Sequence, residues 1–250
     1  MDVVSSTCSL LYVIIDCFNR IQLAREFEDD FAAYQLKLDI LQMRLSRWGE
    51  VAKTSNADLI KEAAVILGKI EDTLGAAQRK AMKTKATLAA SNKETLDPES
   101  NVPNHLKKIR MVFRQCLHKR TAQAGKVVAS MKWAFYQKAQ FDKFIADMSA
   151  LVKDLEDLFP EDLQEKLREL SNEECGAFSK PNLEELMEFA EGCDPWLESA
   201  VDERLKNMSG AGTYITQSHN TGMVTGIHHG DVNGVSNGNN NKTRNYWGRR

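Results

Sequence analysis

Apolar residues recur at intervals of three and four through most of the first 208 positions. This spacing gathers apolar side chains on one face of an α-helix, so it predicts a helical body. One stripe runs to Trp48, where Gly49 is expected to end the helix. A second begins near Asn56 or Asp58 and becomes rich in lysine beyond Gln78. The first stripe consists of Phe27, Phe31, Tyr34, Leu38, Leu41 and Leu45, and the second of Leu59, Ala63, Ile66, Leu67, Ile70 and Leu74.

The helical pattern stops between Ser91 and Pro103, where two prolines predict a loop. It resumes at Asn104 and predicts a long basic helix that reaches residue 135 and bends at Gly125. A further helix over residues 141–158 is closed by Phe159 and Pro160. Two or three short acidic helices follow, near residues 163–170, 183–190 and 196–208, and no alternating strand pattern appears before residue 209. The prediction is an all-α bundle over residues 1–208 and a separate module over residues 209–250.

The segment from Val3 to Ile15 carries no charge and is apolar on nearly every face. At about 1.5 Å per residue it covers about 20 Å of a roughly 30 Å hydrocarbon layer. A longer span would take Asp16 and Arg20 into or near the membrane. Two interpretations stay open, a helix buried in the core and a segment that enters membranes conditionally. The candidate insertion residues are Val3, Val4, Leu10, Leu11, Val13, Ile14, Ile15 and Phe18.

Glycine falls at every fourth position of the tail from Gly222 to Gly238. A helix would lose about 1 kcal/mol at each glycine, whereas β-forming residues are frequent here and proline is absent. Dense asparagine with little charge is typical of cross-β assemblies. We expect a tail that is disordered alone and becomes β on assembly. The candidate amyloid residues are Ile215, Gly222, Val224, Gly226, Ile227, Gly230, Val232, Gly234, Val235 and Gly238.

The net charge of −2 hides a strong asymmetry along the chain. Residues 76–138 hold about fourteen Lys and Arg against three acids, and residues 140–204 about nineteen acids against six bases. The basic run has three candidate partners, namely the acidic part of the same chain, anionic lipid head groups and nucleic acid. Nucleic acid is the weakest of these. The tail cluster that would serve it is short and terminal, and consists of Arg244, Tyr246, Trp247, Arg249 and Arg250.

The common catalytic motifs are missing from the sequence, so no enzymatic activity and no cofactor is expected. There is no G-x-S-x-G, P-loop, H-E-x-x-H or glycine-rich dinucleotide fingerprint. His219, His228, His229 and Asp231 contain metal-binding groups, but a tail rich in glycine and asparagine offers nothing to orient them, so no metal is expected. The carboxylate pairs at residues 29–30, 173–174 and 184–185 are interpreted as solvated.

The five cysteines are odd in number, widely scattered and without a C-x-x-C pair. This pattern predicts a reducing, intracellular location. Cys8 and Cys17, nine residues apart, are interpreted as small apolar fillers of the core.

Several blocks of sequence resemble the HeLo domain family of the fungal HET-S and HET-s proteins. The most specific is Arg44-Leu45-Ser46-Arg47-Trp48-Gly49-Glu50. The resemblance covers most of residues 1–208. The other matching blocks are Ile21-Gln22-Leu23, Gln35-Leu36-Lys37-Leu38-Asp39-Ile40, Lys132-Trp133-Ala134-Phe135-Tyr136 and Asp154-Leu155-Glu156-Asp157-Leu158-Phe159-Pro160.

The resemblance implies a cell-death executor. In such proteins a C-terminal amyloid motif is templated by a matching motif on a NOD-like receptor or a prion partner, and the N-terminal segment then inserts into membranes. It further implies self-association, anionic lipid as a partner, a cytoplasmic resting state and relocation to the plasma membrane. The tail departs from the two longer pseudo-repeats of HET-s and looks closer to shorter fungal motifs related to the RIP homotypic interaction motif. The alternatives are a non-toxic prion or adaptor protein with an inactive body, and an RNA-binding helical protein with a low-complexity tail.

Overall fold

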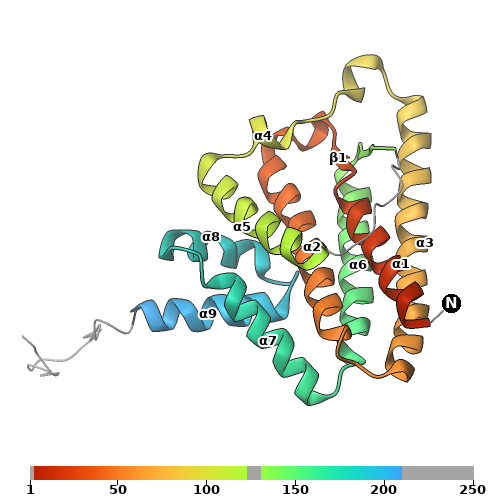
Figure 1. The fold of residues 1–250 in the computed structure, drawn as a ribbon. Helices are drawn as coiled ribbons and strands as arrows, with labels where there is room; N and C mark the ends of the chain where they lie inside the picture. The colour runs from red at the N-terminus through yellow and green to blue at the C-terminus, as the bar shows by residue number, and fades with distance from the viewer. Residues whose placement is uncertain (1–2, 123–130, 210–250) are drawn as a thin grey trace, which may run out of the picture. The chain divides into compact units, whose positions relative to one another are not determined.

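Helices make up most of the computed structural model, which describes residues 3–122 and 131–209 of the chain. In chain order the α-helices of this part are α1 (Val3–Phe18), α2 (Phe31–Ala52), α3 (Ala57–Thr87), α4 (Pro98–Asn101), α5 (Asn104–Thr121), α6 (Lys138–Asp157), α7 (Glu161–Cys175), α8 (Lys180–Ala190) and α9 (Pro195–Ser209). Helix α2 packs against α1, α5, α6, α7 and α8, while α1 also lies along α3 (Figure 1). The predicted helical bundle is confirmed, including α6 and the short acidic helices after it.

Local chemistry explains where α3 begins, and tertiary packing explains why α2 continues past Gly49. Asn56 caps α3, because its side-chain Oδ1 accepts a hydrogen bond from the Leu59 amide at 2.9 Å. The prediction that Gly49 ends α2 is wrong, since the helix runs on to Ala52. A glycine weakens a helix by only about 1 kcal/mol, and packing often outweighs such a preference.

Phe27 belongs to a short 3-10 helix, η1 (Arg25–Asp30), and not to the start of α2. Its ring is nonetheless fully buried, edge-on to Tyr34 at 5.0 Å and to Phe141 at 5.7 Å between ring centroids. The spacing of four between Phe27 and Phe31 therefore marks shared burial, while the chain between them is wound more tightly than an α-helix.

Two short strands form a parallel pair, which corrects two predictions. Strand β1 (Ile21–Leu23) pairs with β2 (Trp133–Phe135) in the register Ile21 with Trp133 and Leu23 with Phe135. The basic helix therefore does not reach residue 135, since α5 ends at Thr121 and residues 133–135 are extended. Three residues are too few to show the alternation by which a strand is recognised.

The predicted loop over residues 91–103 holds more order than expected. It contains the end of a 3-10 helix, η2 (Ala90–Lys93), and the single turn of α4. Asp97 stabilises that turn, because its Oδ2 accepts a hydrogen bond from the Ser100 amide at 3.1 Å. Thr95 also bridges to Ala24, so the segment is tied to the residue that follows β1.

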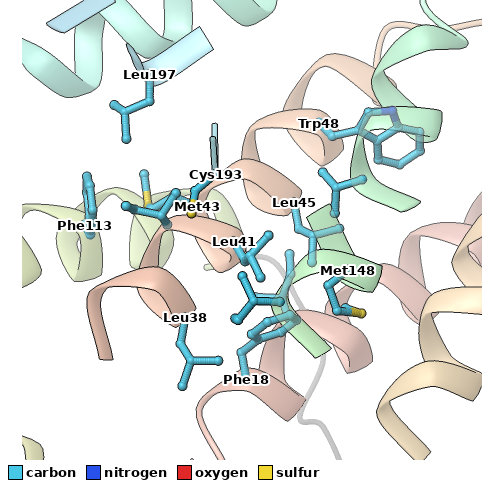
Figure 2. Close-up of a cluster of buried hydrophobic side chains, with 14 of the residues drawn as sticks. Phe18, Leu38, Leu41, Met43, Leu45, Trp48, Phe113, Met148, Cys193 and Leu197 are labelled. Carbon is cyan, nitrogen blue, oxygen red and sulfur yellow. The ribbon is translucent and has the colours of Figure 1, made fainter. Parts of the chain in front are cut away.

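One hydrophobic cluster extends from α1 through α2 and α6 to α9. Figure 2 shows Phe18 of α1, Leu41 of α2 and Met148 of α6 as members of this cluster. An aromatic group closes it near the strands, where Phe135 lies 5.1 Å from both Phe141 and Phe144 between ring centroids. The body thus places α1 inside a single core with partners from distant parts of the chain.

Candidate functional site

The candidate insertion segment folds as α1, and most of its described apolar residues belong to the core. Ile14 is fully buried, and Leu11, Ile15 and Phe18 are each 4% exposed. Leu10 is half-buried against the same core, whereas Val13 is 37% exposed. The side chains of Val3 and Val4 lie outside the described part of the structure. The core-helix interpretation therefore describes this conformation, and the conditional-membrane interpretation stays a prediction.

A close approach between α1 and α2 is centred on Gly49. A Cβ atom at this position would collide with Cδ2 of Leu11. Glycine lets the two helices come together here, because it has no side chain to hold them apart. Gly49, which was expected to end α2, therefore allows α1 to pack closely against α2.

Polar contacts fix the C-terminal end of α1. The buried Gln42 side chain on α2 donates hydrogen bonds from Nε2 to the Ile15 carbonyl and to Oδ1 of Asn19, both at 2.9 Å. At the same end, Nε of Arg20 donates to Oδ2 of Asp16 at 2.8 Å. These contacts satisfy backbone and side-chain groups that the end of a helix leaves open.

The outer face of α1 carries no charge from Ser5 to Val13, and the part-exposed Asp16 follows near the C-terminal end. Ser5, Ser6 and Ser9 are exposed together with Val13, and the hydroxyl of Ser9 donates to the Ser5 carbonyl at 2.8 Å. An ordinary surface helix of a soluble protein carries charged residues on that side. Within the described part of the chain, no helix combines the length and the hydropathy that crossing a bilayer requires.

The Arg44–Glu50 block is joined to three other parts of the fold by buried ion pairs. Arg44 binds both carboxylate oxygens of Glu156 on α6, at 2.8 and 2.7 Å. Arg47 binds Glu174 of α7, with a shortest distance of 2.6 Å, and Asp194, which precedes α9, at 3.1 and 3.0 Å. Bidentate pairs of this kind combine strength with geometric specificity.

Two further contacts complete this network. Arg120 of α5 binds Oε1 of Glu174 at 2.6 Å. Trp48 donates from Nε1 to the Leu155 carbonyl at 2.9 Å, and its ring stacks on Phe159 with 5.5 Å between centroids. Helix α2 thus holds α5, α6, α7 and the start of α9 through one block of sequence.

Burial and ion pairing shift the pKa values of these groups in opposite directions. Burial alone would lower the pKa of the Arg47 guanidinium, but Asp194 and Glu174 raise that pKa above its ordinary value, so Arg47 stays charged. For Glu156, burial raises the pKa above its usual range and Arg44 opposes the rise. Burial also raises the pKa of the nearby Cys175 thiol to about 12, which keeps it protonated and supports a structural role for this cysteine.

The interpretation of all three carboxylate pairs as solvated is partly wrong. Glu174 is only 1% exposed and binds two arginines, while its neighbour Glu173 is exposed. A signal was available in the sequence, because Glu174 continues the apolar stripe of α7 through Leu163 and Leu167 and therefore faces the core.

The basic run finds acidic partners along α5 and at the start of α6, in part from the acidic last third as expected. These pairs are Arg120 with Glu174, His105 with Glu185, Arg110 with Asp39, and Lys138 with Asp30. No such pair is found for the basic C-terminal half of α3 among the residues that the structure describes.

The five cysteines are free thiols, and Cys17 packs against the core as predicted for a filler. The candidate amyloid residues from Ile215 to Gly238 lie outside the described residues, as do the tail histidines and the terminal basic cluster. The predictions made for the tail therefore stay predictions.

Comparisons with known proteins agree on one family. A family model described as "HeLo: Prion-inhibition and propagation" matches residues 2–189. Heterokaryon incompatibility protein s of Podospora anserina is 28% identical over 208 residues, which cover 78% of this chain and 70% of that protein. Heterokaryon incompatibility protein S of the same fungus is 26% identical over 211 residues, with the same coverage.

A solved structure of the HET-s N-terminal domain shares the fold of the helical body. Its TM-score is 0.76 at 22% identity, over 82% of this chain and 99% of that domain. A mutant of the same domain gives a TM-score of 0.73 over 80% of this chain. Because the identity is low, these matches establish the fold and leave the activity to be argued from the residues.

Proposed function

Because the chain belongs to the HeLo family, whose model spans residues 2–189, we propose that it is a heterokaryon-incompatibility protein that kills cells by permeabilising membranes when its tail is templated. In this proposal the body is not an enzyme. It stores α1 in the resting state and delivers it to lipid on activation. The family match and the two relatives support the prion-related role, and the chemistry of α1 supports the membrane step.

The observation that carries the proposal is the absence of charge on the exposed side of α1 from Val3 to Ile15. Its buried residues account for a core helix, but a core helix of a soluble body has no need of an uncharged outer face. Charged residues placed in the membrane interior cost several kcal/mol, whereas serine and valine cost little. A helix that occupies both environments has to avoid charge on every face, as α1 does from Val3 to Ile15.

The length of α1 suggests that several copies act together. Its 16 residues span about 24 Å, less than a hydrocarbon layer of roughly 30 Å. Asp16 and Arg20 stand at its C-terminal end, where each neutralises the other. Copies assembled on a fibril would place these groups side by side around a water-filled interior.

The tail is proposed to receive the signal. Residues 209–250 would adopt a cross-β fold when templated by copies of this chain or by a NOD-like receptor or prion protein with a matching motif. Ile215, Val224, Ile227, Val232 and Val235 would form its dry interior, with the glycines at the turns. The resting protein would be cytoplasmic and the activated protein would relocate to the plasma membrane, with anionic lipids as partners.

Val13 provides the sharpest test, because it is exposed in the resting body while its neighbours Leu11 and Ile14 are buried. A charge at Ile14 would unfold the core, whereas Val13→Asp leaves stability within about 0.5 kcal/mol. In lipid the same aspartate costs about 3 kcal/mol. We expect V13D to fold, to form fibrils when seeded, and to lose leakage of anionic liposomes.

The assay measures release of a trapped dye with and without seeds made from peptide 209–250. Val65→Asp is the matched control, because Val65 is exposed on α3. This variant should cause the same liposome leakage as the wild type. Leakage by V13D equal to wild type would remove α1 from the mechanism. A wild-type chain that forms fibrils on seeds without causing leakage would be a prion or adaptor protein with an inactive body.

A further inference from the structure

A groove of about 300 Å³ lies between the C-terminal half of α3 and strand β2. Helix α3 contributes residues at helical spacing to one wall, and β2 with its neighbours contributes the other. In Figure 1 this part of α3 is the end remote from the chain's N-terminus. The lining residues are Gln78, Ala81, Met82, Lys85, Ala86, Lys93, Met131, Lys132, Trp133, Ala134 and Tyr136.

The groove is strongly basic. Lys85, Lys93 and Lys132 line it, and three more exposed bases lie nearby in the sequence of α3. Glu94, next to Lys93, is the acid nearest in the sequence to the lining residues. Within residues 3–122 and 131–209, none of the six bases forms an ion pair. The three further bases are Arg79, Lys80 and Lys83.

The groove also exposes an unusual amount of apolar surface. Met82 is 58% exposed and Met131 is 78% exposed. Trp133, which also lines the groove, is half-buried. Flexible methionine side chains adapt to irregular apolar partners, and tryptophan favours the boundary between water and hydrocarbon.

Tyr136 adds a polar hydroxyl group to the lining of the groove, and the residue as a whole is only 5% exposed.

We propose that this groove docks the protein onto membranes that contain anionic phospholipids. Lysine ammonium groups attract lipid phosphates and carboxylates, and lysine stems reach along apolar surface while their charges stay in the head-group layer. Met82, Met131 and Trp133 would enter the boundary with the acyl chains. Single-stranded nucleic acid fits less well, since its binders use several aromatic platforms and the groove offers only Trp133 next to two methionines.

The position of the groove gives docking a consequence for α1. Strand β2 pairs with β1, which begins shortly after the last residue of α1, Phe18. A membrane held against the groove would therefore lie near the C-terminal end of α1. The inference relies on the proposed encounter with membranes, but it requires no pore and no fibril.

Binding of the full-length, unseeded chain to vesicles tests the proposal. Vesicles of phosphatidylcholine, with and without phosphatidylserine, are sedimented with the protein at low and at physiological ionic strength. Each lysine near an anionic surface changes the partition coefficient by about fivefold, so K85Q/K93Q/K132Q should lower it by about a hundredfold. The matched control K61Q/K143Q/K153Q removes the same charge from exposed positions on α3 and α6 and should bind like the wild type.

Two further measurements separate the apolar contribution from simple charge attraction. Met82→Ser with Met131→Ser should weaken binding to anionic vesicles by about tenfold while leaving the salt dependence unchanged. Met111→Ser, at an exposed methionine on α5, is the control. Brominated phosphatidylserine should quench tryptophan fluorescence in the wild type, and W133F should lose most of that quenching.

The proposal fails if the groove and control lysine variants bind anionic vesicles equally, or if the wild type does not bind them. It also fails if quenching persists in W133F, which places the lipid elsewhere. Circular dichroism establishes that each variant is folded. If vesicle binding does not depend on the groove, the proposed seeded leakage is not affected by that result. If the protein binds vesicles but seeds cause no leakage, only the proposed function is contradicted. Binding of an acidic peptide or RNA in preference to vesicles would overturn the lipid assignment.

Discussion

Gly49 sets how closely α1 approaches α2. A methyl group there would meet Cδ2 of Leu11, a side chain that is itself 4% exposed and has little room to move. Overpacking of this kind costs about 1–3 kcal/mol, partly offset by the better helix propensity of alanine. We expect Gly49→Ala to lower the free energy of unfolding in urea and to loosen α1 before the rest of the body.

Gly68 provides the control for that prediction. It lies in the middle of α3, and a Cβ atom there would meet nothing within 4 Å. Gly68→Ala should therefore raise the free energy of unfolding by about 0.5–1 kcal/mol. If both alanine variants were stabilised equally, the contact with Leu11 would have no energetic weight.

At this scale, composition does not distinguish a buried residue from its exposed neighbour, whereas helical spacing does. Glu173 and Glu174 are identical side chains one position apart, and only the second lies on the stripe that faces the core. Acidic composition around them favoured a solvated interpretation of both. The orientation of α7 instead buries Glu174, where it pairs with Arg47 and Arg120 from distant helices.

Among the elements, α2 carries the largest share of the polar core. Removing Arg47 would leave Glu174 and Asp194 buried with less compensation, which costs about 3–5 kcal/mol for a buried ion pair. We expect Arg47→Ala to unfold the body at markedly lower urea concentration and to increase the susceptibility of α7–α9 to proteolysis.

Arg168→Ala is the comparison variant. Arg168 pairs with Glu165 on the outer face of α7, and both side chains are more than half exposed. Such pairs contribute about 0.5 kcal/mol or less. Equal destabilisation by the two arginine variants would contradict the assignment of Arg47 to the structural network.

The helices were predictable as elements because each carries a long apolar stripe, whereas the strands were not. Residues 21–23 and 133–135 are too short to show a period, and their pairing depends on a partner about 110 residues away. Trp133 and Phe135 are also apolar, so in the sequence they look like a continuation of the apolar stripe of the basic helix. The membrane candidates were found by composition, but which of them face the core required the packing of α1 against α2 and α3.

For the whole molecule, the central prediction is that signal reception and membrane action reside in separate parts of the chain. A chain ending at Ser209 should keep the helical body, because the core described here lies before that residue. It should bind anionic vesicles through the α3–β2 groove and fail to leak when seeds are added. Liposome sedimentation and dye release on the same preparation measure both.

Deletion of residues 242–250 alone is the control for the truncation. It removes Trp247 and the terminal bases, including Arg244, while keeping the glycine-spaced stretch. This variant should still respond to seeds. Seeded leakage by the chain ending at Ser209 would show that the tail is not the receiver.

The pairing of β1 with β2 also has a consequence during synthesis. Strand β1 and α1 leave the ribosome first, but β2 follows about 110 residues later. At about 5–20 residues per second, α1 waits about 5–20 seconds for this part of its surroundings. The nascent chain would therefore expose the charge-free segment Val3–Ile15 until β2 has been made. Under the proposed function, we expect chaperones at the ribosome to keep this segment away from membranes during that interval.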